Sequence, residues 1–320
     1  MEKKSAKIRY FSTVTSRNVD WLWYPYIPFG KITIIQGDPG DGKTTLVLNI
    51  AAILSNGTSM PESNTQIPAA KIIYQSAEDG AEDTLKPRLV SAGADCSQIA
   101  FIDESESGLT FNDRRIEWAI RETGARLIVL DPLQAYLGEN NEMSRADGIR
   151  PTMKHLTVMA ERTGCAIVII GHMNKASGTK SIYRGLGSID ITAAARSVLL
   201  VGRVKSNPSI RVMAQLKNSL APEGKPIAFE INDNSSIRWI GTYNITAEDL
   251  LLGNEPLDEG GKLSETVDSL RDMLQNGKIA CTRIYECFQD TGVSKRTVDS
   301  AKKKLEVKSI KLADGWYWSL

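Results

Sequence analysis

The run from Gly37 to Thr44 carries residue types that hold a nucleoside triphosphate. It reads Gly-Asp-Pro-Gly-Asp-Gly-Lys-Thr and fits the pattern G-x-x-x-x-G-K-[ST] at every position. Glycines let the backbone turn so that several N–H groups point at phosphate oxygens, while the lysine contacts the β- and γ-phosphates. We therefore expect ATP to bind here, and the predicted contacts are Gly37, Asp38, Pro39, Gly40, Asp41, Gly42, Lys43, Thr44 and Thr45.

Asp131 supplies the carboxylate that such a site needs for Mg²⁺. It follows the apolar run 127–130, so it stands where a buried strand ends. In a parallel sheet this end lies near the phosphate loop, because ligands bind outside the carboxyl ends of the strands. We expect Asp131 and the Thr44 hydroxyl to hold the metal, although an acid before a proline is also a common turn residue.

Hydrolysis also needs a group that orients and deprotonates the attacking water. Glu78 comes first after the predicted strand 71–77 and is our candidate, with Asp79, Glu82 and Asp83 as competitors in the same acidic turn. His172 follows another predicted strand, 165–170, where its side chain would sense the γ-phosphate. The alternative for His172 is a structural role.

The elements that must position these residues alternate between strand and helix. We predict strands at 31–36, 71–77, 99–102, 126–131 and 165–170, and helices at 45–54, 83–92, 112–123 and 149–163. Three or four more strands are predicted among the ranges 195–202, 210–216, 226–231 and 236–241. This order predicts an α/β fold, with a mainly parallel sheet that is covered by helices and continues into an antiparallel extension.

A second unit follows a segment whose composition indicates a linker, 246–262. Helices are predicted at 264–275, 282–290 and 295–305, and paired strands at 308–312 and 315–320. Three helices and a hairpin are the plan of a winged helix-turn-helix. We therefore divide the chain into an ATPase domain at 1–245, the linker, and a winged-helix domain at 263–320.

Composition limits the class of protein but does not reveal a partner. The 320 residues carry a net charge of +1, so any surface for nucleic acid must be local. The 4 cysteines have no metal-ligand spacing, which fits buried thiols in a reducing cytoplasm. The start, Met1 to Ser5, lacks the apolar run of a signal peptide, and no segment is apolar enough to span a membrane, so a cytoplasmic location is expected.

The order of these motifs resembles the RecA-like P-loop ATPases over roughly residues 20–245, and most closely the RepA-type and DnaB-type hexameric helicases of phages and prophages. Lys43, Thr44, Glu78, Asp131 and His172 match the nucleotide-site motifs of that group, with His172 in place of the glutamine of many members. Prophage-type members also carry a C-terminal winged helix with an ending like Gly315 to Ser319.

In that group each site lies between two subunits, and the neighbour supplies a basic residue that stabilises the transferring phosphoryl group. Three residues match such a finger, and our order of preference is Arg196, Lys217 and Arg184. The loops 138–149 and 175–188 match the central-channel loops of the group; the second contains Lys175, Lys180, Tyr183 and Arg184. These loops either contact single-stranded DNA or are ordinary surface loops.

The predicted helix 295–305 and the strand after it are strongly basic. Residues 295–311 include seven lysines or arginines and two acids. Val298, Ala301 and Leu305 give the helix an apolar face, so the lysines occupy the other face, as DNA recognition requires. A helix that docks a protein partner is the alternative.

Taken together, the resemblance implies an ATP-hydrolysing DNA helicase or translocase with Mg²⁺ as cofactor. It would form a homo-oligomer, a hexameric ring, on single-stranded or duplex DNA, in phage or mobile-element replication. Two alternatives use the same residues: an ATP-gated DNA loader or recombination mediator that does not unwind DNA, and a DNA-binding regulator with a regulatory nucleotide site.

Overall fold

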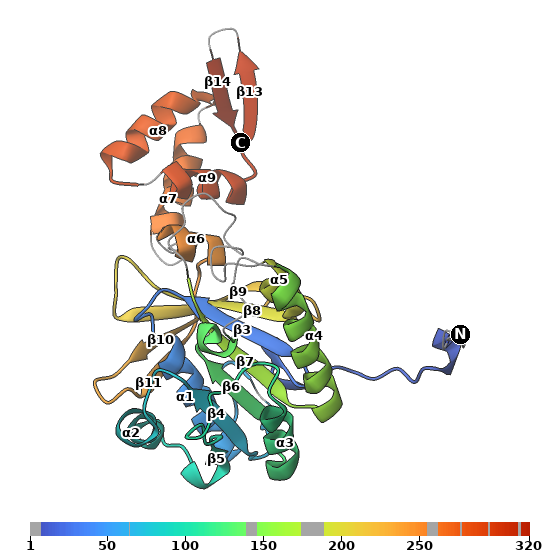
Figure 1. The fold of residues 1–320 in the computed structure, drawn as a ribbon. Coiled ribbons are helices and arrows are strands. Elements are labelled where there is room, and N and C mark those ends of the chain that lie inside the picture. Colours follow the sequence, from blue (N-terminus) through green and yellow to red (C-terminus); the bar gives the residue numbers. More distant parts are fainter. Residues whose placement is uncertain are drawn as a thin grey trace.

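A large mixed sheet organises the chain in the computed structural model, which describes residues 8–63, 65–138, 146–173, 189–254, 262–275, 277–293, 295–312 and 315–320. The strand order of this nine-stranded sheet is β11-β10-β9-β8-β3-β7-β6-β4-β5 (Figure 1). Its strands are β3 (Ile32–Gly37), β4 (Ile72–Ser76), β5 (Ile99–Ala100), β6 (Leu127–Asp131), β7 (Ala166–His172), β8 (Ser197–Arg203), β9 (Ile210–Asn218), β10 (Ile227–Ile231) and β11 (Ile237–Thr242).

The predicted mixture of parallel and antiparallel strands is confirmed. In sheet order, the neighbours β5, β4, β6, β7, β3 and β8 pair in parallel. The neighbours β8, β9, β10 and β11 pair antiparallel. Central strands such as β3 and β6 are buried along their whole length, which explains their continuous apolar sequences. The parallel strands therefore present their carboxyl ends along one edge.

Helices cover both faces of this sheet (Figure 1). One apolar cluster joins α1 (Lys43–Asn56) and α2 (Lys86–Ser91) to one face. A second cluster joins α3 (Arg114–Thr123), α4 (Ala146–Thr163) and α5 (Ile189–Ala194) to the other face. The small β1 (Trp21–Trp23) and β2 (Ile27–Pro28) pair with each other, and the buried side chains of Leu22, Trp23 and Ile27 extend the first cluster. The short helical turns are η1 (Phe11–Thr13), η2 (Ala81–Leu85), η3 (Cys96–Gln98) and η4 (Leu133–Tyr136).

Several predicted ranges differ from the structure. The helix expected at 83–92 begins as the π-helical turn η2 and becomes α-helical only at Lys86. The strand expected at 99–102 ends at Ala100, because residues 101 onward leave the sheet edge. The range 246–262 contains a short helix, α6 (Ala247–Leu252), whose buried Leu250 packs beside Gly202 of β8.

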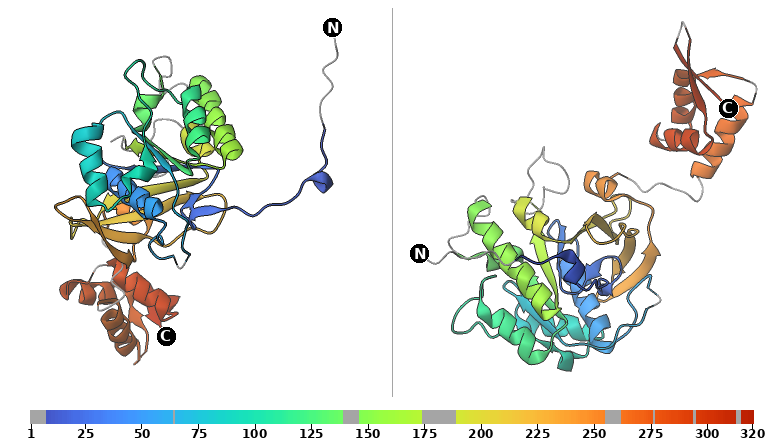
Figure 2. Two further views of the ribbon diagram at one scale, coloured as in Figure 1. Left: turned by 90° about the horizontal axis from the view of Figure 1, so that it is seen from below. Right: turned by 90° about the vertical axis from the view of Figure 1, so that its right-hand side faces the viewer.

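The last described residues form a unit with its own core. It contains α7 (Lys262–Leu274), β12 (Ile279–Ala280), α8 (Cys281–Asp290), α9 (Lys295–Lys304), β13 (Lys308–Leu312) and β14 (Gly315–Ser319). The three strands pair in the order β12-β14-β13, and Figure 2 shows these elements gathered apart from the large sheet. Leu270, Ile284, Val298 and Trp318 are at the centre of its apolar cluster. Among the described residues, none of the helices is long and apolar enough to cross a bilayer.

Candidate nucleotide-binding site

The loop between β3 and α1 has the backbone shape that its glycines permit. Gly40 and Gly42 adopt φ values of 81° and 92°, in the left-handed region that favours glycine. Gly37 is constrained differently, since a Cβ there would lie 2.1 Å from the carbonyl oxygen of Val201. Gly42 then caps α1, so the unpaired N–H groups of the first helical turn face the loop.

Lys43 lies inside this loop and is only 4% exposed. Its Nζ donates hydrogen bonds to the carbonyl oxygens of Gly37 at 3.0 Å and Asp38 at 2.8 Å. Burial lowers the pKa of Lys43, while the nearby carboxylates of Asp41 and Asp131 favour its charged form. The ammonium group is therefore held where a phosphate group can replace the carbonyl oxygens as its partner.

Thr44 and Asp131 form the predicted metal-binding pair. Thr44 Oγ1 donates to Asp131 Oδ2 at 2.8 Å, and the Tyr74 hydroxyl donates to the same oxygen at 3.3 Å. Burial raises the pKa of Asp131, and these two hydrogen bonds act in the opposite direction. A hydroxyl and a carboxylate suit Mg²⁺, which takes one or two protein ligands and completes its shell with phosphate and water. The residues present therefore fit the ion.

Glu78 and His172 meet across the carboxyl end of β6. Glu78 Oε2 lies 3.6 Å from His172 Nε2, and the glutamate side chain is 62% exposed. Because β6 lies between β4 and β7, this pair spans the strand that carries Asp131. The competitor Asp79 differs, since its Oδ2 accepts from Arg88 Nη1 at 3.0 Å. Asp79 is thus paired with Arg88, whereas the carboxylate of Glu78 lies beside His172.

A polar network that the sequence analysis missed braces β4 at Gln75, its penultimate residue. The amide of Gln75 exchanges two hydrogen bonds with the backbone of Ile102, at 2.9 and 3.1 Å. It also bonds to Glu104, whose other oxygen accepts from the N–H of Leu109 at 2.7 Å. The segment after β5 is therefore tied to the strand that leads to Glu78.

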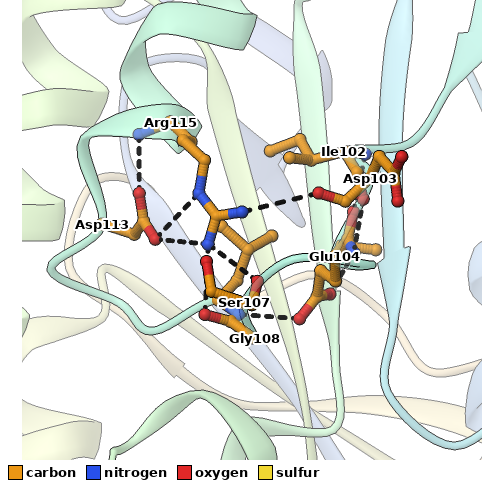
Figure 3. A network of polar contacts seen from close by, with 9 residues as sticks. Ile102, Asp103, Glu104, Ser107, Gly108, Asp113 and Arg115 are labelled. Carbon is orange, nitrogen blue, oxygen red and sulfur yellow. Dashed lines mark hydrogen bonds and ion pairs between the residues drawn. The ribbon is translucent and has the colours of Figure 1, made fainter.

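Arg115 closes the other side of the same segment (Figure 3). Its guanidinium donates to the carbonyl oxygens of Ser107 at 3.0 Å and Gly108 at 3.1 Å, and it pairs with Asp113 at 2.8 Å. Asp113 also caps α3 by accepting from the N–H of Arg115. No motif marks these residues, because their partners lie in irregular structure.

The proposed finger residues lie far from the loop of their own chain. Arg196 precedes the first residue of β8, and Lys217 pairs with Val198 near the same end. Both therefore lie at the amino edge of the parallel strands, roughly 20 Å along β8 from its carboxyl end. Arg196 is exposed, whereas Lys217 Nζ donates to the carbonyl oxygens of Thr192 and Ala195, both at 2.8 Å.

Part of the predicted DNA surface cannot be placed. Residues 139–145 and 174–188 lie outside the described residues, and with them most of both expected channel loops. Lys175, Lys180, Tyr183 and the third finger candidate, Arg184, are among the residues outside the described ranges.

Two further arginines flank the phosphate loop and were also missed. Arg203 ends β8 and pairs through Nε with Asp41 Oδ1 at 3.3 Å, and Arg211 of β9 packs beside Gly42. The sequence contains one signal for Arg203, since it directly follows the predicted strand 195–202. Nothing in the sequence indicates that this strand lies next to β3.

Comparison with known proteins agrees with this geometry. A family model described as AAA domain matches residues 5–178, more than half of the chain. The DNA repair protein RadA of Halalkalibacterium halodurans is 27% identical over 227 residues, which cover 69% of this chain and 43% of that protein. RadA of Bacillus subtilis is 22% identical over 249 residues, covering 77% and 48%.

The chain thus spans less than half of the length of these two curated relatives. A crystal structure of the RadB recombinase aligns with a TM-score of 0.47 and 20% identity, over 66% of this chain and 91% of that one.

Proposed function

The chain belongs to the AAA domain family, and from this premise we propose that it is an ATPase that hydrolyses MgATP at 37–44 and uses the cycle to act on DNA in recombination or repair. One observation carries the proposal. Lys43, Thr44 and Asp131 converge at the carboxyl edge of a parallel sheet, with Thr44 hydrogen-bonded to Asp131 at 2.8 Å. This edge is where such folds bind their ligands.

Each side chain has a distinct task in this proposal. The N–H groups of the loop and the Lys43 ammonium bind the β- and γ-phosphates. Thr44 and Asp131 hold Mg²⁺, which supplies neutralisation of phosphate charge when bound. Glu78 orients the attacking water and takes its proton, and its neighbour His172 at 3.6 Å responds to the γ-phosphate.

We propose that a second copy of the chain completes the site. Arg196 is exposed at the amino edge of β8, too far to reach its own loop but free to reach that of a neighbour. Lys217 is the weaker candidate, because its ammonium already caps the carbonyl groups at the end of α5. This supports a homo-oligomer, for which we retain the hexameric ring as the proposed form.

DNA contact is proposed at two places. One is the pair of loops around 138–149 and 175–188. The other is the C-terminal unit, whose three helices and three-stranded sheet we interpret as a winged helix. In α9 the side chains of Val298 and Ala301 are buried in the core of that unit, and Lys303 and Lys304 are exposed. The exposed lysines suit contacts to phosphate.

The relatives favour a mediator or loader over a replicative helicase. Both curated relatives are DNA repair proteins. We therefore propose that ATP controls the loading of this chain on DNA, or the joining of a second DNA strand to the complex. In either case the chain does not unwind duplex DNA. The helicase in phage or mobile-element replication stays a second proposal, supported by the motif order in the sequence.

A paired assay separates these functions. Phosphate release is measured with and without single-stranded DNA, followed by strand displacement on a forked duplex and by ATP-dependent retention on circular single strands. DNA-stimulated hydrolysis with retention but no displacement supports the mediator, and displacement supports the helicase.

Lys43→Ala should lower turnover by at least about 100-fold. Wild-type turnover in Lys43→Ala would overturn the ATPase site itself, and turnover insensitive to DNA would favour a regulator.

A further inference from the structure

The phosphate loop of this chain contains two acids, although it must bind a polyanion. Asp38 and Asp41 both occupy variable positions of the motif. Asp41 is only 15% exposed, and its carboxyl accepts a hydrogen bond from the N–H of Asp38 at 3.2 Å. Burial, and then the charge of Asp38, raise the pKa of Asp41, while Lys43 and Arg203 act to lower it. Without a nearby cation, an ionised Asp41 would repel the phosphates of a nucleotide.

Arg203 supplies that cation from the neighbouring strand. Its Nε lies 3.3 Å from Asp41 Oδ1, and its Nη2 donates to the carbonyl oxygen of Gly40. One guanidinium thus holds both the acid of the loop and its backbone. The carbonyl oxygen of Gly40 is therefore held toward Arg203.

Arg211 lies beside Arg203 on the next strand. The two arginines are direct partners in the pairing of β8 with β9. A Cβ on Gly42 would lie 3.1 Å from Arg211 Cδ, so the arginine stem packs against the loop. Arg211 Nε is buried without a hydrogen-bond partner, and Nη1 donates to the carbonyl oxygen of Ser209 at 3.1 Å. Burial, and then the charge of Arg203, lower the pKa of Arg211, while the charge of Asp41 acts to raise it, so Asp41 partly offsets the repulsion between the two arginines.

We propose that Arg203 is a positioning residue of the nucleotide site: it neutralises Asp41 and fixes the phosphate loop in its binding conformation. The inference rests on the proposed nucleotide site. It adds a residue that acts within one chain and is distinct from any finger supplied by a neighbour. In this proposal the loop tolerates Asp41 because β8 brings a cation beside it.

The test is a double-mutant cycle on nucleotide binding. Arg203→Gln, Asp41→Asn and the double variant are titrated with fluorescent MgATP and MgADP analogues. Arg203→Gln should weaken MgATP binding by about tenfold, a loss of about 1.4 kcal/mol, and MgADP binding by less, because ATP carries more charge. Asp41→Asn should bind at least as tightly as wild type. The double variant should recover to within about threefold of wild type, since no uncompensated acid remains.

Recovery of MgATP binding in the double variant would show that Arg203 compensates the charge of Asp41. If the role of Arg203 were merely structural, Asp41→Asn would not restore binding. Arg238→Gln is the matched control, because it removes an arginine of β11 that pairs with a different acid, Glu230 of β10. If Arg203→Gln does not fold, Arg203→Lys should fold and show an intermediate loss, since lysine keeps the charge but not the two-pronged contact.

Two results would overturn the inference: unchanged MgATP affinity in Arg203→Gln, or a double variant as weak as Arg203→Gln. Lys43→Ala separates this failure from failure of the site. Lost binding in Lys43→Ala with unchanged binding in Arg203→Gln refutes only the role of Arg203. Unchanged binding in both refutes the proposed site.

Discussion

Thr44 and Asp131 are 87 positions apart in the chain, yet the hydroxyl of Thr44 donates to Asp131 Oδ2 at 2.8 Å. The first turn of α1 and the last residue of β6 meet at this bond. Tyr74, from the strand beside β6, donates to the same oxygen at 3.3 Å. Both donors are neutral hydroxyls, so the buried carboxylate of Asp131 is costly for the fold and suited to a divalent cation.

Asp131→Asn should therefore stabilise the protein at pH 7.5 without Mg²⁺ or nucleotide. Burial raises the folded-state pKa of Asp131, so protonation favours the folded state and the ionised form costs stability. The variant should melt a few degrees higher, because about 1 kcal/mol shifts Tm by about 2–4 °C in a domain of this size. The difference should narrow as the pH falls through the folded-state pKa. Calorimetry across that range checks both statements, and a lower Tm at pH 7.5 would contradict them.

Glu78→Gln should separate hydrolysis from binding. The amide cannot take a proton from water, so turnover should fall by at least about 100-fold while the Kd for MgATP stays within about threefold. Asp79→Asn is the matched control, since Asp79 is paired with Arg88. It should retain most of its turnover. Phosphate release and fluorescence titration measure the two quantities; equal losses in both variants would remove Glu78 as the base.

The Arg196→Ala variant should lack ATPase activity on its own and regain part of it when it is mixed with Lys43→Ala. A subunit with Lys43→Ala lacks a working loop but retains Arg196, whereas one with Arg196→Ala has the opposite defect. If the site lies between subunits, mixed oligomers contain some complete sites, up to about one quarter at equal proportions. ATPase activity of the mixture is compared with that of each variant. A mixture as inactive as its components, or an active Arg196→Ala, would argue against a shared site.

Lys217→Ala should act on stability. Its ammonium bonds the last carbonyl groups of α5, so its loss should cost about 1–2 kcal/mol. A Tm lowered by a few degrees, with turnover per folded molecule retained, would agree with a capping role. Lost turnover at unchanged Tm would instead place Lys217 in the neighbour's site.

Lys303→Gln combined with Lys304→Gln should weaken binding to DNA. Both lysines are exposed on α9, and each phosphate contact contributes about one to the dependence of log K on log salt. The slope should fall by about two if both lysines contact phosphate. Fluorescence anisotropy over a salt series measures it. Lys71→Gln combined with Lys86→Gln, two exposed lysines outside the C-terminal unit, is the control, and equal slopes in all three proteins would exclude α9 as a DNA surface.

The sequence was sufficient to predict the phosphate loop, the strand before it and the carboxylate that ends β6. These depend on neighbours in the chain: glycine spacing, runs of apolar residues and the point where such a run stops. The proximity of Asp131 to Thr44 also followed, because parallel strands bring their carboxyl ends to one edge.

The tertiary structure alone decided which strand lies next to β3. β8 begins 160 positions after Gly37, and its place in the sheet brings Arg203 to Asp41 and leaves Arg196 at the opposite edge. The same packing turns Lys217 toward the end of α5. Such contacts arise from sheet order and from the connections between strands, which a local pattern of residues does not encode.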